Sequence, residues 1–115
     1  MAILSRVPVR ERAAGDIEKA FPGRWLEVDL VDDELTLIGV YGPLKGESFN
    51  DFWALALRRV AEHRKLPVLL LGDLNTGESG FDAPRHIKNF FCSKHFAAIK
   101  ATGLVDDGVS GTAVI

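Results

Sequence analysis

The sequence is poor in cysteine and in long apolar runs. Its one cysteine, Cys92, excludes an internal disulfide and fits a reducing compartment. No apolar run approaches the roughly 20 residues that cross a bilayer. The opening stretch MAILSRVPVRER also lacks the apolar core of a signal peptide. We therefore expect no membrane span and a cytoplasmic protein.

Charge of one sign is also scarce, because 14 Lys and Arg residues face 16 Asp and Glu residues, a net charge of −2. This balance is not typical of a protein that binds nucleic acid through electrostatic attraction to its phosphate backbone, although local basic patches remain possible. The 115 residues, 47% of them hydrophobic, are enough for one soluble domain with a modest core.

Alternating residues predict an antiparallel hairpin in the first half of the chain. Arg24–Leu30 alternates between an apolar face and a face with Glu27 and Asp29, which is typical of a half-buried strand. After an acidic turn, Glu34–Tyr41 forms the second strand. Pro43 ends it, because proline cannot donate to a β-ladder.

An apolar stripe predicts a helix from Ser48 to Arg64, with Ser48 as its N-cap. Val68–Leu71 follows as the most hydrophobic strand and needs cover on both faces. The other expected elements are a strand at Ala2–Ser5, a loose helix within Glu11–Phe21, a helix at Ser93–Thr102 and a strand from Leu104. This mixture favours an α/β or α+β class, a mixed sheet with flanking helices.

Two polar residues, Asp73 and Asn75, follow the hydrophobic strand directly. The carboxyl ends of such strands border the crevice where ligands bind. In extended geometry Leu74 points back into the protein, so its two neighbours face one pocket. There a carboxylate can orient water or hold a cation, and an amide can bind phosphate or a metal. The competing interpretation is an Asx turn, which is the commoner fate of these residues after a strand.

The order of the sequence segments around Asp73 and Asn75 favours a functional site over a simple turn. LTLIGVYGPL, an amphipathic helix, LPVLLLGDLNTG and a helix ending ATGLVDDG resemble the endonuclease/exonuclease/phosphatase superfamily, the DNase-I-like and exonuclease-III-like phosphoesterases. The resemblance implies a metal-dependent phosphoester hydrolase, of nuclease or phosphatase type. It implies that Asp73 activates water or contacts Mg²⁺ or Mn²⁺, that Asn75 binds the phosphate or that metal, and that Tyr41 directs its hydroxyl at the phosphate.

The chain also departs from the family pattern. Gly39 stands where the family has Asn, and neither the Glu that is the family's principal magnesium ligand nor its final Asp-His pair has a match. We therefore expect residues 1–115 to form a single partial domain, roughly half of a four-layer α/β/β/α sandwich. The alternative is a non-catalytic remnant that associates with itself or with a complementary chain. The substrate stays open between nucleic acid, a phosphorylated small molecule and a lipid headgroup.

Four other patterns have plainer explanations. Asp32–Glu34 is expected to be a solvated turn, and His63 a solvated residue at a helix end. Cys92 and His95 have metal-like spacing, but a structural zinc needs four ligands. Residues 72–80 could form the ligand loop of a small α/β binding domain, yet they lack the glycine spacing and the lysine of a phosphate-binding loop.

Overall fold

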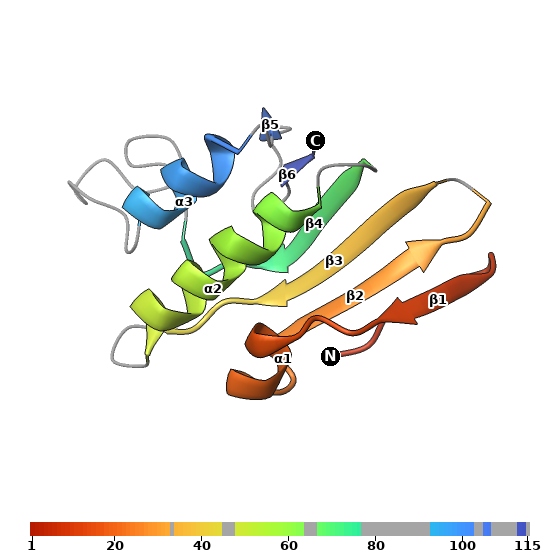
Figure 1. Ribbon diagram of the computed structural model, residues 1–115, viewed down its shortest axis with the longest axis horizontal. Helices are drawn as coiled ribbons and strands as arrows, with labels where there is room; N and C mark the ends of the chain where they lie inside the picture. The colour runs from red at the N-terminus through yellow and green to blue at the C-terminus, as the bar shows by residue number, and fades with distance from the viewer. Residues whose placement is uncertain are drawn as a thin grey trace.

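The computed structural model describes residues 1–32, 34–44, 48–63, 67–76, 93–102, 105–106 and 113–114. Within these ranges the strands form one mixed sheet in the order β1-β2-β3-β4-β6-β5 (Figure 1). The strands are β1 (Val9–Arg12), β2 (Trp25–Leu30), β3 (Leu35–Tyr41), β4 (Val68–Asp73), β5 (Val105–Asp106) and β6 (Ala113–Val114). The helices are α1 (Asp16–Ala20), α2 (Phe49–Glu62) and α3 (Ser93–Lys100).

The sheet is antiparallel except at its centre. β1, β2 and β3 form an antiparallel meander, and β3 pairs in parallel with β4 through the α2 crossover. Helix α2 lies along one face of the sheet (Figure 1). The expected α+β class, a mixed sheet with flanking helices, is confirmed. None of the described helices is both long and apolar enough to cross a bilayer.

The predicted apolar stripe of α2 forms the centre of the core. Phe52, Trp53, Ala56 and Val60 are each at most 2% exposed. Phe52 and Trp53 meet edge to face at 5.1 Å between ring centroids, a favoured aromatic geometry. Ser48 precedes the helix as expected, but its side chain makes no capping hydrogen bond.

The hairpin is confirmed, and its more polar face is the one that α2 covers. Trp25 and Glu27 of β2 are 3% and 0% exposed, whereas Leu26 on the other face is only half-buried. Alternation shows that a strand has two different faces but not which face a helix covers. Here the helix supplies polar partners for Glu27, as described below.

The strand expected at Ala2–Ser5 is wrong. The Ser5 hydroxyl donates to the Val7 carbonyl oxygen at 2.9 Å and accepts from the Val7 N–H at 3.1 Å. This local turn competes with ladder pairing. The exposed edge strand is β1 instead, and its charged residues suit an edge. Since β1 takes residues 9–12, the loose helix expected within Glu11–Phe21 is shortened to α1.

Candidate functional site

Tyr41 and Asp73 end two neighbouring parallel strands and are register partners. Partners in a parallel pair point to the same face. Val40 and Leu70 are buried in the core with α2, so their neighbours along each strand face the opposite side. Both Tyr41 and Asp73 are exposed. The structure therefore brings this phenol and this carboxylate together at the C-terminal ends of β3 and β4, on one face of the sheet.

Two glycines let the strand ends approach this closely. The Gly42 N–H donates to the Asp73 carbonyl oxygen at 2.7 Å, and a Cβ on Gly42 would overlap the Leu74 carbonyl oxygen. Gly72 has φ +135, and a Cβ there would overlap the Val40 carbonyl oxygen. A side chain at either position would push β3 and β4 apart.

Asn75 lies at the site, but not through the extended backbone geometry that the sequence predicted. Its φ of 52 is left-handed, so extended geometry ends at the buried Leu74 and simple alternation does not place Asn75. Instead Asn75 Nδ2 donates to the Gly42 carbonyl oxygen at 2.8 Å, and the Asn75 N–H donates to Asp73 Oδ1 at 3.1 Å. The Asx turn and the approach of the amide to the site thus occur together.

Arg24 is a neighbour of Tyr41 that the sequence did not single out. Its guanidinium lies 4.9 Å from the Tyr41 ring centroid. Arg24 Nη1 also donates to the Tyr41 and Gly42 carbonyl oxygens at 3.4 and 3.3 Å. The hairpin register contains the signal that could have found it, because Trp25 pairs with Val40 and the preceding residue therefore lies across from Tyr41.

The described donor set does not by itself fit a complete Mg²⁺ site. Asp73 and Asn75 offer one carboxylate and one amide, and Asp73 Oδ1 already accepts a backbone N–H. Among the described residues no group of three His, Cys, Asp or Glu side chains could hold a metal. Octahedral Mg²⁺ needs further oxygen ligands, from water, substrate or other protein groups.

A second polar cluster is buried between β2 and α2. Glu27 is 0% exposed, and its Oε1 accepts from Trp25 Nε1 and Arg59 Nε, each at 2.7 Å. Its Oε2 accepts from Arg59 Nη2 at 2.7 Å and His63 Nε2 at 3.0 Å. Burial raises the pKa of Glu27, but the hydrogen bonds from His63, Arg59 and Trp25 outweigh it and lower that pKa to about 2.

This cluster has a structural role rather than a catalytic one. Four N–H donors saturate the Glu27 carboxylate, whose side chain is 0% exposed and so offers no free oxygen to a substrate. The His63 side chain is 6% exposed, so the expectation that it is solvated is wrong. The cluster joins the crossover helix to the hairpin and thereby helps to hold β3 and β4 in place.

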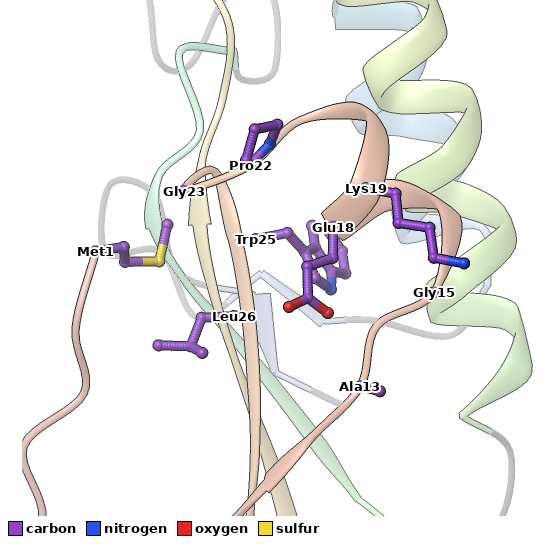
Figure 2. Close-up of a pocket in the computed structure, with 9 residues that line it drawn as sticks. All are labelled: Met1, Ala13, Gly15, Glu18, Lys19, Pro22, Gly23, Trp25 and Leu26. Atoms are coloured by element: carbon purple, nitrogen blue, oxygen red, sulfur yellow. The ribbon is translucent and has the colours of Figure 1, made fainter.

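A hollow of about 660 Å³ lies between α1 and the start of β2 (Figure 2). Its lining includes Trp25 and Leu26, which pair with β3 but extend beyond β1. The carboxylate of Glu18 in its wall already accepts the Ala14 N–H at 3.0 Å. The hollow contains none of Tyr41, Asp73 and Asn75 and is not the predicted site.

The remaining predicted features fall outside the described part of the chain. Asp33, one residue of the acidic turn, and Cys92 are not described, and neither is the side chain of His95. The possible ligand loop at residues 72–80 is described only to Thr76. These interpretations stay predictions.

No protein-family model matches the chain, and no curated protein matches it either. Among solved structures it is similar to an AP endonuclease from Archaeoglobus fulgidus, with a TM-score of 0.63 and 16% sequence identity. The match covers 84% of this chain and 43% of that chain. The likeness is one of fold, a DNase-I-like arrangement of strands and helices, and this chain spans less than half of the similar structure.

Proposed function

We propose that the chain is all or part of a phosphoester hydrolase of nuclease or phosphatase type. The observation that carries the proposal is the register pairing of Tyr41 with Asp73 at the ends of two parallel strands. Asn75 is held beside them by hydrogen bonds to Asp73 and Gly42. A carboxylate, a phenol and an amide at these strand ends suit attack of water on the phosphorus atom of a phosphate ester, with cleavage of the P–O bond and departure of the alcohol.

Each of the three side chains has a chemical role in the proposal. The Asp73 carboxylate orients the attacking water and accepts its proton. The Tyr41 hydroxyl donates a hydrogen bond to a phosphate oxygen, where negative charge develops in the transition state. Asn75 uses one amide hydrogen on Gly42, which leaves Oδ1 and the second hydrogen to meet the phosphate or a cation.

The proposal includes Mg²⁺ or Mn²⁺, for which the described residues supply only some of the ligands. Asp73 and Asn75 are the candidate ligands, and at least one principal carboxylate has to come from outside the described residues. The proposed domain, residues 1–115, is correspondingly partial, since it spans 43% of the similar endonuclease chain.

The proposed substrate is a phosphate ester, with a nucleic-acid phosphodiester as the first class to test. The fold is similar to that of an AP endonuclease, which supports this choice. The net charge of −2 gives no general attraction to duplex DNA, so we expect recognition to be local. Phosphorylated small molecules and lipid headgroups are the other classes.

Hydrolysis by the full chain in Mg²⁺ tests the proposal. The substrates are a duplex oligonucleotide with an abasic site, a single-stranded oligonucleotide and a chromogenic phosphate ester. We expect Asp73→Asn to lower the rate roughly 100-fold or more while circular dichroism stays unchanged. Asp32→Asn, at an exposed turn position, is the matched control and should retain the rate. A fully active Asp73→Asn protein would contradict the proposal, and so would a wild-type chain that cleaves none of the three and also does not respond to phosphate.

A non-catalytic role through self-association is the second candidate, and the sheet face opposite α2 favours it. This face carries a row of half-buried leucines: Leu26, Leu30, Leu37, Leu69 and Leu71. The N-terminal residues Met1 and Ile3 lie over Gly39 on this face, and Leu4 next to them in sequence is 97% exposed. Apolar surface of this kind is typical of an interface. Light scattering after size-exclusion chromatography decides: a dimer that Leu71→Lys dissociates supports this role, and a monomer at all concentrations contradicts it.

A further inference from the structure

Three side chains form a row across the sheet at the proposed site. Arg24 lies across from Tyr41, whose N–H donates to the Arg24 carbonyl oxygen at 2.9 Å. Tyr41 in turn is the register partner of Asp73. A guanidinium, a phenol ring and a carboxylate thus stand on adjacent strand ends and on the same face.

The Arg24 side chain limits the freedom of the Tyr41 ring. Tyr41 as a residue is 43% exposed, so its ring has room to change rotamer. The guanidinium lies against the ring at 4.9 Å from its centroid, while Nη1 is tied to the Tyr41 and Gly42 carbonyl oxygens. A planar cation held by the backbone in this way favours one ring orientation.

The Gly42 peptide connects Arg24 to the other two side chains of the site. Its carbonyl oxygen accepts from Arg24 Nη1 at 3.3 Å and from Asn75 Nδ2 at 2.8 Å. Its N–H donates to the Asp73 carbonyl oxygen at 2.7 Å. A shift of this peptide would therefore move the contacts of all three residues.

We propose that Arg24 is a positioning residue, which orients the Tyr41 phenol toward the phosphate beside Asp73. The proposal rests on the proposed function, because it takes Tyr41 as the group that meets the phosphate. Arg24 acts through the ring and through Gly42, so its removal should disturb Tyr41 first. A lysine at this position keeps a cation for the ring but loses the planar fork.

Tyr41 is the only tyrosine of the sequence, so its ring gives a single labelled NMR signal set. We expect nuclear Overhauser contacts between the ring and the Arg24 side chain in the full-length chain with isotope-labelled tyrosine. Arg24→Met should shift the ring signals, and Arg24→Lys should shift them less. Arg10→Met, which removes an exposed arginine on β1, is the matched control and should leave them in place.

Titration with inorganic phosphate, followed by the NMR signals of the Tyr41 ring, tests whether Arg24 affects phosphate binding. We expect phosphate to shift the Tyr41 signals in the wild type, and Arg24→Met to weaken that response roughly 10-fold in apparent affinity. Where hydrolysis is measurable, Arg24→Met should lower kcat more than it raises KM. In a Tyr41→Phe background, which lacks the hydroxyl, the same change should have little further effect.

The outcomes separate the two proposals. The positioning role is overturned if Arg24→Met leaves the Tyr41 ring signals unchanged. It is also overturned if the losses of kcat or phosphate affinity caused by Arg24→Met and Tyr41→Phe multiply in the double variant. If Arg24→Met does not fold, unchanged ring signals in Arg24→Lys together with absent Overhauser contacts overturn it as well. A clear Arg24 effect on the ring, combined with no hydrolysis and no phosphate response, supports the orientation of Tyr41 by Arg24 and contradicts the hydrolase.

Discussion

Arg59 holds both carboxylate oxygens of Glu27, with Nε to Oε1 and Nη2 to Oε2 at 2.7 Å each. The pair joins α2 to β2, and burial makes it sensitive to the loss of either partner. Replacing one member of a buried pair leaves the other charge without compensation.

Glu27→Gln should lower the free energy of unfolding by about 3 kcal/mol or more, because Arg59 and His63 lose their charged acceptor. Urea denaturation followed by circular dichroism measures the change. Asp16→Asn is the matched control, since its pair with Arg58 is exposed and should contribute less than about 1 kcal/mol. Equal losses in the two variants would contradict a structural role for the buried pair.

Glu27 should also make stability depend on pH. Its pKa is lowered from 4.5 to about 2 in the folded state, so the ionised carboxylate favours folding above the unfolded pKa. This contribution is lost as the pH falls from about 4.5 toward 2. Denaturation midpoints across this window should fall less steeply in Glu27→Gln than in the wild type. Parallel curves for the two proteins would refute the assignment.

Gly42→Ala should destabilise the site end of the sheet, because the new Cβ meets the Leu74 carbonyl oxygen. We expect a loss of about 2 kcal/mol, in the range of overpacking, with amide shifts concentrated at Asp73 and Asn75. Gly23→Ala is a useful comparison: its φ of +77 is strained for alanine, but nothing lies within 4 Å of the added carbon. Shifts spread evenly over the sheet in Gly42→Ala would argue against the close approach.

Asn75→Asp should weaken the site while keeping a residue that tolerates the left-handed conformation. The substitution places a carboxylate oxygen against the Gly42 carbonyl oxygen, where Nδ2 now donates. Asn75→Gly, which has neither the donor nor the repulsion, is the comparison. We expect phosphate affinity to fall in both and stability to fall more in Asn75→Asp, by roughly 1 to 3 kcal/mol. Wild-type stability in both variants would show that the Asn75–Gly42 hydrogen bond is unimportant, and equal losses in the two would show that the carboxylate adds no repulsion.

The sequence predicts the elements that depend on local periodicity. The stripe through Phe52 and Val60, the hairpin and the hydrophobic strand before Asp73 are all present in the structure. Only the family resemblance linked Tyr41 to the site of Asp73, and the structure makes the two residues register partners. Their chemical roles stay predictions.

Other features depend on residues far apart in the chain. Glu27 is buried because partners 32 and 36 positions later, Arg59 and His63, reach it from α2. Neither strand alternation nor a basic helix end reveals that contact. The Asx turn at Asn75 was the competing interpretation of the sequence, but the contact of its side chain with the Gly42 carbonyl oxygen, 33 positions away, was not foreseen for a related reason.

The Glu27 carboxylate, through its hydrogen bonds to Arg59, affects how a ligand would bind at the C-terminal ends of β3 and β4. The helix that it anchors is the only covalent link, among the described elements, between the strands that carry Tyr41 and Asp73. Relative sliding of those strands is opposed by their own hydrogen-bonded ladder and by the core that they share with α2. The site at these strand ends is thus preorganised, so the conformational entropy lost on binding is mainly that of the ligand. Selectivity should therefore depend on the shape of the ligand more than on rearrangement of the protein.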